Sequence, residues 1–270
     1  MLQSAPCEAE SAATTALNAA RFSVQSDDVF GRIASRYDLL SDLFSFGIHR
    51  HWKRRVARLI ANEGWSELLD TASGTGDIVL RVLQRQGTPG SRHVVASDTS
   101  PQMLDIARRR LARMGQHAEL RILDAERMPE IAANSLDLYS MSLGLKICDR
   151  AAVLREALRV LKPGGRLVVL EASNIPIPWL QRAYLRYMRL CMPVIGWLAT
   201  GGDASAYLYL LRGIREFPPA EELAEQIREL GFEEVRFERL SLGIVAIHSA
   251  RKPRVNPTPS QTNGARKDYR

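Results

Sequence analysis

The sequence predicts an α/β fold: a doubly wound, Rossmann-like sheet of seven strands with an antiparallel terminal hairpin and an N-terminal helical cap. Beyond residue 62, short apolar runs alternate with amphipathic helical patterns, as is typical of βαβ units with parallel strands. Two further runs near the C-terminus are joined by a short connection, which requires antiparallel strands. A turn rich in glycine and serine, at 73–76, follows the first run.

The helical cap is expected within 29–60, where apolar residues recur at spacings of three and four on both sides of the turn SFGIHR. A later helix is expected to begin at Ser100 and Pro101, because a serine cap followed by proline favours a helix N-terminus. The predicted helices after the cap cover 77–86, 100–114, 150–161, 178–198 and 219–230.

The predicted strands are the apolar runs between these helices. KPGG at 162–165 is expected to stop one helix and turn the chain into the next strand. Ligands of open α/β sheets bind outside the carboxyl ends of the strands, so the site is expected there. The parallel strands are expected at 67–72, 93–98, 118–124, 135–143 and 166–172, and the hairpin at 233–241 and 243–250.

Composition divides the chain into one folded domain and two extensions. Residues 1–27 are rich in Ala, Ser and Thr and lack an apolar core of signal-peptide length, and 251–270 are basic and polar; both are expected to be disordered. The domain is expected at 28–250, with the cap at 28–62 and an inserted lid at about 175–215.

Composition also excludes several classes of protein. The longest apolar stretch, 187–199, is interrupted by Arg189 and Pro193 and is shorter than a membrane span of about 20 residues. Three cysteines show neither paired nor metal-ligand spacing, which fits a reducing compartment and no metal site. The net charge of +7 lies largely near the C-terminus, and such a tail is weak evidence for nucleic acid. A cytoplasmic protein, at most peripheral at a membrane, is expected.

The turn at 73–76 is a candidate nucleotide site with an acidic residue on each side. A dinucleotide fingerprint needs a third glycine where this chain has Val79. A phosphate loop continues with lysine and a hydroxyl residue, whereas Asp77 presents a carboxylate that would repel phosphate. A nucleoside ligand without phosphates and with a positive centre fits, as in S-adenosyl-L-methionine.

Three acidic residues end successive predicted strands. Asp70 is placed to order the turn, in which Gly74 and Gly76 let the backbone approach a ligand closely. Asp98 can accept both ribose hydroxyls, and Asp124 can accept the adenine amino group. Alternatively, Asp98 and Asp124 simply begin helices. Their coincidence with the glycine turn favours the cofactor.

Several longer motifs point to a known family. VFGRIASRYDLLSDLFSFGIHRHWKRR at 29–55, together with SLGLK, RVLKPGGRLVVLE, AYLYLLRGIREFP and LGIVAIH, resembles the ubiquinone/menaquinone biosynthesis C-methyltransferases. This resemblance runs from about Val29 to Ala250 and implies a class I S-adenosylmethionine-dependent methyltransferase domain. The family's cofactor positions fall on Thr75, Asp98, Asp124, Ala125 and Ser142.

The chain departs from the family pattern at two places. Ser73-Gly74 replaces Gly-Gly, and SLGLKICD has Leu143 for an aromatic residue, Lys146 for arginine and no asparagine. The second change lies where the resemblance places the substrate. The expected reaction is C-methylation of a quinol or phenolic ring, such as demethylmenaquinol or a ubiquinone precursor. The alternatives are a paralogue that methylates carbon, oxygen or nitrogen of another metabolite, and a nucleic-acid methyltransferase or basic binding module.

Candidate catalytic residues follow from the expected reaction. A cation beside the developing phenolate would stabilise it, and Lys146 is the first candidate, against the alternative of a lysine that snorkels to solvent. Tyr37, His49 and Arg50 come next, because the resemblance folds their segment over the cofactor. His49 could act as a base, with a structural histidine as the alternative. Cys148 lacks the dipeptides of nucleophilic methyltransferase cysteines and is expected to be structural.

The predicted helix at 178–198 suggests how substrate arrives. Arg182, Arg186 and Arg189 form a basic stripe opposite an apolar face. As a lid, this helix would touch a membrane surface and admit a prenylated substrate, whereas the alternative is an ordinary solvated face over a core face. The expected partner is a small aromatic substrate, prenylated if the membrane hypothesis holds, with no nucleic acid; a homodimer stays open.

Overall fold

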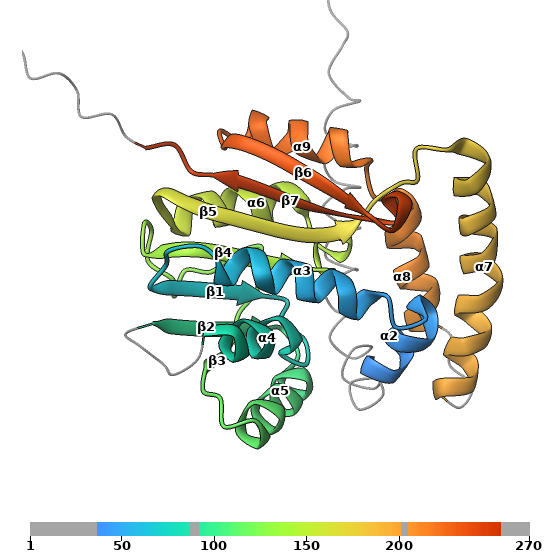
Figure 1. Cartoon of the computed structure of the whole chain (residues 1–270), viewed down its shortest axis with the longest axis horizontal. Coiled ribbons are helices and arrows are strands. Elements are labelled where there is room, and N and C mark those ends of the chain that lie inside the picture. Colours follow the sequence, from blue (N-terminus) through green and yellow to red (C-terminus); the bar gives the residue numbers. More distant parts are fainter. Residues whose placement is uncertain (1–36, 87–91, 201–204, 255–270) are drawn as a thin grey trace, which may run out of the picture.

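A seven-stranded sheet forms the centre of the protein (Figure 1), for which a computed structural model describes residues 37–86, 92–200 and 205–254. The strands lie in the order β3-β2-β1-β4-β5-β7-β6. They are β1 (Glu67–Thr71), β2 (His93–Asp98), β3 (Glu119–Ile122), β4 (Leu136–Ser142), β5 (Leu161–Ala172), β6 (Glu233–Leu240) and β7 (Val245–Arg251).

Strand pairing confirms the predicted topology. The first five strands are parallel, and β7 pairs antiparallel with both β5 and β6. From β1 the chain runs outward to β2 and β3 and then returns to β4 on the other side of β1. The carboxyl ends of β1 and β4 therefore form the switch point at which such sheets bind ligands.

The described helices surround the sheet. Ser100 begins α5 as predicted, because its side chain accepts a hydrogen bond from the Met103 amide. The α-helices are α2 (Tyr37–Ser45), α3 (His49–Ala61), α4 (Asp77–Gln86), α5 (Pro101–Arg113), α6 (Arg150–Val160), α7 (Pro178–Thr200), α8 (Ser205–Glu216) and α9 (Ala220–Glu229). Two short 3-10 helices are η2 (Leu145–Ile147) and η3 (Ser241–Gly243).

Two hydrophobic clusters fill the space between the sheet and its helices. Leu68 of β1 belongs to the cluster formed with α3 and α4, whereas the next residue, Leu69, belongs to the cluster formed with α6 and α9. This alternation follows from the two-residue period of a strand. The sheet is therefore buried on both faces, and its carboxyl edge is left to carry the site.

Helix α3 of the predicted cap packs on a face of the sheet, whereas α2 and the helices of the predicted lid, α7 and α8, lie beyond the carboxyl ends of the parallel strands. Figure 1 shows α2, α7 and α8 together at that edge, on the right of the view. Phe46, between α2 and α3, stacks on Tyr187 of α7 with ring centroids 6.2 Å apart. Gly213 lets α8 approach η2 closely, since a Cβ atom there would lie 3.1 Å from the Lys146 carbonyl oxygen. Cap and lid thus meet over the switch point.

The structure corrects two predictions. KPGG does not precede its strand: β5 begins at Leu161, directly after α6, because Leu161 already pairs with Leu136 of β4. A further helix, α8, lies between the predicted helices at 178–198 and 219–230, where no helix was predicted.

The predicted extensions lie almost entirely outside the described residues. Residues 1–27 and 255–270 are not described, but β7 includes Arg251, and the Lys252 ammonium donates a 2.7 Å hydrogen bond to the Leu158 carbonyl. The described part of the chain contains no helix that combines the length and the apolar character needed to cross a membrane.

Candidate active site

The glycine turn connects β1 to α4 and requires its glycines. Gly74 and Gly76 have φ angles of 54° and 74°, in the left-handed region that favours glycine. Gly76 also faces α5, where a Cβ atom would lie 3.0 Å from the Ala107 side chain. The turn is therefore tight and presents its backbone at the carboxyl edge of the sheet.

Asp70 lies beneath this turn and holds it. Its carboxylate accepts hydrogen bonds from the hydroxyls of Ser140, at 2.6 Å, and Ser73, at 2.8 Å. Burial raises the pKa of Asp70 to about 6, against the lowering effect of the two hydroxyl donors. The geometry agrees with the predicted ordering role of Asp70.

Asp98 closes the turn from the neighbouring strand. One carboxylate oxygen accepts the Gly74 amide at 2.8 Å, and the other accepts the Ser100 amide at 2.9 Å. The N-cap of α5 is Ser100, not Asp98. The Asp98 carboxylate therefore lies against the glycine turn at the end of β2, where the ribose hydroxyls are predicted to bind.

Asp124 and Ala125 follow β3 at the same edge. Asp124 is exposed and accepts the Glu126 amide at 2.9 Å, and Ala125 is buried. No helix begins there, because the chain continues through a described loop to β4. The alternative of a helix-start residue is therefore wrong for Asp124.

Ser142 ends β4, beside the turn. Its hydroxyl is buried and has no hydrogen-bond partner among the described residues. A buried hydroxyl without a partner costs free energy. A polar ligand at this edge would supply the missing partner, so Ser142 fits the predicted cofactor position.

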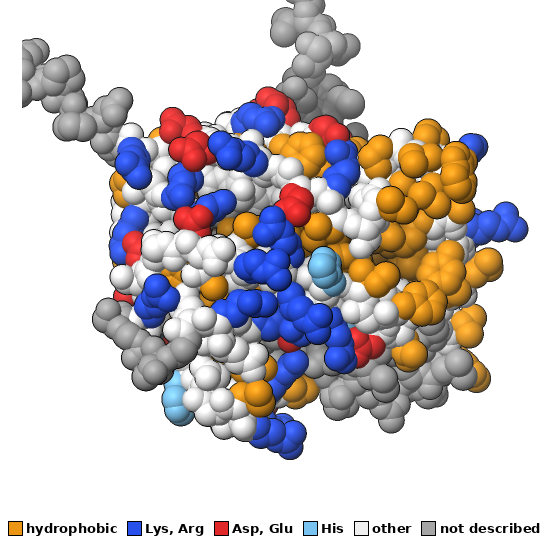
Figure 2. Space-filling model, viewed as in Figure 1, with side chains coloured by type: hydrophobic (Ala, Val, Ile, Leu, Met, Phe, Trp, Pro, Cys, Tyr) orange, Lys and Arg blue, Asp and Glu red, His pale blue; other side chains and the backbone are white. Residues whose placement is uncertain are grey.

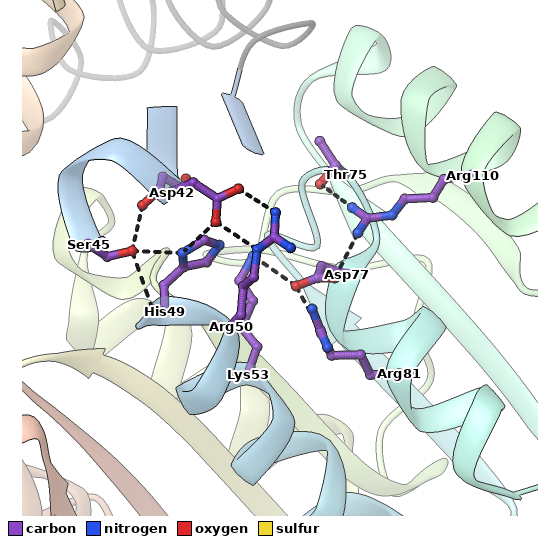
Figure 3. Close-up of polar contacts among 10 residues, drawn as sticks. Asp42, Ser45, His49, Arg50, Lys53, Thr75, Asp77, Arg81 and Arg110 are labelled. Atoms are coloured by element: carbon purple, nitrogen blue, oxygen red, sulfur yellow. Dashed lines mark hydrogen bonds and ion pairs between the residues drawn. The ribbon is translucent and has the colours of Figure 1, made fainter. Parts of the chain in front are cut away.

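His49 begins α3 in the cap and is 5% exposed. Its Nδ1 atom lies 2.8 Å from the Ser45 hydroxyl and 3.7 Å from Asp42 (Figure 3). Burial lowers the pKa of His49, and the nearby charge of Lys53 lowers it further. The imidazole is therefore held neutral, as a base must be, while its Nδ1 atom is engaged inside the cap.

Arg50 and Tyr37, the other two cap candidates, are not equivalent. Arg50 is exposed and makes a bidentate ion pair with Asp42 (Figure 3). The Arg50 hydrogen bonds lower the pKa of Asp42. Arg50 thus braces the junction of α2 and α3. Tyr37 begins α2, and its side chain lies outside the described part of the structure.

Lys146 lies in η2, just past β4, and its side chain is 7% exposed. The ammonium lies 3.2 Å from the carboxylate of Glu171 and donates to the Leu143 carbonyl. Glu171 is fully buried in β5 and also accepts the Lys146 amide at 3.1 Å. The alternative of a snorkelling lysine is therefore wrong.

A cluster of cations around Asp77 was not predicted from the sequence. The Asp77 carboxylate faces Lys53 of α3, Arg81 of α4 and Arg110 of α5 (Figure 3). The oxygen–nitrogen distances are 3.4, 3.1 and 2.9 Å, respectively. Arg110 also donates to the Thr75 hydroxyl at 3.3 Å, and Thr75 is buried. The available signal was Lys53 itself, a charge between two apolar positions on the inner face of an amphipathic helix.

The surroundings of Cys148 agree with the predicted structural role: its thiol donates a 3.4 Å hydrogen bond to the Gly144 carbonyl. Burial raises the pKa of its thiol to about 12, so the reactive thiolate is not populated near neutral pH. Within the described residues there is also no group of three or more His, Cys, Asp or Glu side chains placed to hold a metal ion.

Together, the residues at this edge fit S-adenosylmethionine. A tight glycine turn, carboxylates at the ends of β1 and β2 and after β3, and a partnerless hydroxyl at the end of β4 converge on the switch point. A family model described as the ubiE/COQ5 methyltransferase family matches residues 15–252. The chain belongs to this family.

Members of the ubiE/COQ5 family resemble the chain over most of its length. The protein from Paracoccus denitrificans named ubiquinone/menaquinone biosynthesis C-methyltransferase UbiE is 44% identical, over 83% of this chain and 89% of its own. The protein of the same name from Cereibacter sphaeroides is 43% identical, again over 83% of this chain and 89% of its own. The mitochondrial 2-methoxy-6-polyprenyl-1,4-benzoquinol methylase of Caenorhabditis elegans is 39% identical over 84% of this chain and 79% of its own.

The fold agrees with this membership. A SAM-dependent methyltransferase from Thermotoga maritima superposes with a TM-score of 0.59, at 20% identity, over 84% of this chain and 99% of its own. The protein is thus an S-adenosylmethionine-dependent methyltransferase with the class I fold, as predicted.

Proposed function

We propose that the protein transfers a methyl group from S-adenosylmethionine to a ring carbon of a hydroquinone in quinone biosynthesis. The observation that carries this proposal is the 44% identity, over 83% of the chain, with a relative named as a ubiquinone/menaquinone biosynthesis C-methyltransferase. The apolar lid over the switch point supports a hydrophobic substrate.

S-adenosylmethionine supplies an electrophilic methyl group, so the protein has to orient the ring, exclude water and stabilise the phenolate. Asp70, Asp98, Asp124 and Ser142, with the glycine turn, are proposed to hold the cofactor at the carboxyl edge. The helices of the cap and lid are proposed to exclude water.

Lys146 is proposed to stabilise the phenolate. It lies four residues beyond Ser142, under α8, and carries a positive charge close to the switch point. Glu171 holds the Lys146 ammonium in place through the 3.2 Å ion pair. His49, neutral and at the start of α3, is the proposed alternative group for the hydroxyl proton, with Arg50 and Tyr37 in the same cap.

Incubating the protein with methyl-labelled S-adenosylmethionine and a bacterial cell extract, and then separating its lipids, water-soluble metabolites and nucleic acids, tests the proposed substrate. We expect label in a prenylated hydroquinone, identified by mass, with the methyl group on a ring carbon. Label on oxygen, or in a water-soluble metabolite, would contradict the proposal and favour the paralogue alternative. Label in nucleic acid would favour the alternative of a nucleic-acid methyltransferase.

We further propose that the lid lies on an anionic membrane surface. On α7, Trp179, Leu190, Val194 and Trp197 are each more than half exposed. At about 100° per residue, these four side chains fall within one sector of about 60°. Figure 2 shows hydrophobic side chains gathered over α7, on the right of the view, beside Lys and Arg side chains over α3.

The charges that flank the apolar stripe support this surface. Arg182, Arg186 and Arg189 are exposed beside the apolar stripe, while Met188 and Met192 on the inner face of α7 are buried. An apolar stripe with tryptophan, bordered by basic residues, is typical of helices that lie in a membrane interface. The exposed Trp stripe, not the basic stripe alone, is the stronger evidence.

The combined variant Trp179→Ser and Trp197→Ser tests the membrane proposal. We expect cosedimentation with vesicles containing 30% anionic lipid to fall by about tenfold or more, because two interfacial side chains of some 1.5–3 kcal/mol each are lost. The matched control Met114→Ser and Ile122→Ser changes two exposed apolar residues remote from the lid and should bind as the unmodified protein does. Equal binding by both variants would contradict the proposal.

A further inference from the structure

Lys53 is a buried cation whose role the proposed reaction does not explain. It lies on the inner face of α3 between Trp52 and Val56, and its side chain is 10% exposed. Lysine is almost never this buried unless it is paired. In the described part of the chain its acidic partner at ion-pair distance is Asp77, at 3.4 Å. Good charge-assisted hydrogen bonds are shorter, about 2.7–2.9 Å, and an ammonium has three donors.

Asp77 carries one negative charge and faces two further cations besides Lys53. These are Arg81, at 3.1 Å, and Arg110, at 2.9 Å. Burial would raise the pKa of Asp77, but the charges of Lys53, Arg81 and Arg110 outweigh burial and hold the pKa below its usual value. A buried positive charge beyond those that one carboxylate requires is costly unless another anion shares it.

The position of Lys53 indicates which anion this is. The adenine and ribose contacts predicted for the cofactor end β3 and β2, and the glycine turn ends β1. Because the sheet order is β3-β2-β1-β4, the cofactor's amino-acid end falls at β1 and β4. Lys53 lies there: its partner Asp77 directly follows Gly76 and begins α4, whose N-terminus favours negative charge. The charge of Lys53 also lowers the pKa of Asp70 beneath the turn.

We propose that the Lys53 ammonium binds the α-carboxylate of S-adenosylmethionine and that Asp77 is the residue that positions it. The cap helix then contributes directly to cofactor binding, instead of only covering the site. This inference depends on the cofactor and not on the proposed quinone substrate.

Two ligands that differ only at the amino-acid end test the role of Lys53. S-adenosylhomocysteine carries the α-carboxylate, whereas 5′-methylthioadenosine keeps the adenine, ribose and thioether but lacks the amino-acid group. By calorimetry we expect Lys53→Met to weaken S-adenosylhomocysteine binding by about 10- to 100-fold, as for a lost charge-assisted hydrogen bond. Binding of 5′-methylthioadenosine should change less than about twofold, because this ligand has no carboxylate for Lys53 to contact.

Arg55→Met is the matched control. It removes another cation from α3, one that pairs with Glu238 of β6 at 2.9 Å, and both ligands should bind it as they bind the unmodified protein. The ratio of the two affinities is decisive, because partial loss of the folded cap lowers both affinities by the same factor. If Lys53→Met does not fold, Lys53→Gln is titrated in the same way. Equal losses for both ligands, or no loss for either, would overturn the proposal.

Discussion

Asp98→Ala is expected to weaken S-adenosylmethionine binding by about 10²-fold or more, because two charge-assisted hydrogen bonds of some 1.5–3 kcal/mol each are lost. The same substitution removes the acceptor of the Gly74 and Ser100 amides, so the turn also loses its support from β2. The lost ribose contacts and the loosened turn both lower the affinity for the cofactor. Calorimetry with S-adenosylhomocysteine measures the change in affinity.

Two variants make this result interpretable. Asp98→Asn keeps one acceptor oxygen without the charge, and its affinity should lie between those of Asp98→Ala and the unmodified protein. Asp105→Ala removes an exposed carboxylate of α5 that pairs with Arg108, and it should bind normally. An unchanged affinity in folded Asp98→Ala would remove Asp98 from the cofactor site.

Most of the sheet could be predicted because its strands are apolar runs bounded by polar turns. The start of β5 could not, since the pairing of Leu161 with Leu136 depends on a neighbouring strand and not on the local pattern of KPGG. The helix α8 was missed, and Gly213 within it lowers helix propensity where close packing on η2 requires glycine. Tertiary contacts overrode the local signal at both places.

On α7, the helical period separates the exposed arginines from an apolar face, of which Met188 and Met192 are buried. It did not predict the exposed stripe that contains Trp179 and Trp197, because an apolar residue in a sequence does not reveal whether it faces a core or the solvent. Only the packed structure separates these two faces of the helix.

Part of the candidate site could likewise be predicted from the sequence, and part could not. Asp70, Asp98 and Ser142 could be predicted as neighbours because the ends of parallel strands meet at one edge. The partners of Lys53 and Lys146 could not: Asp77 lies 24 residues beyond Lys53, and Glu171 lies 25 residues beyond Lys146. No short-range pattern joins such pairs, so a sequence shows the charge and not what it faces.

Lys146→Ala is expected to lower kcat by about 10²–10³-fold with little change in S-adenosylmethionine affinity, if the ammonium stabilises the phenolate as an oxyanion-hole donor does. The substitution also leaves Glu171 buried and uncompensated, which should destabilise the fold by about 3–5 kcal/mol. Lys146→Arg restores the charge and the family's residue, and it should retain much of the activity. Turnover and urea unfolding are measured on the same samples.

The double variant Lys146→Ala and Glu171→Gln separates the two roles of the lysine. Replacing the carboxylate removes the uncompensated charge, so the double variant should recover much of the lost stability. Its kcat should stay as low as that of Lys146→Ala, because no cation then faces the developing phenolate. Recovery of turnover together with stability would show that Lys146 only neutralises Glu171. The phenolate would then depend on His49, Arg50 or Tyr37 of the cap.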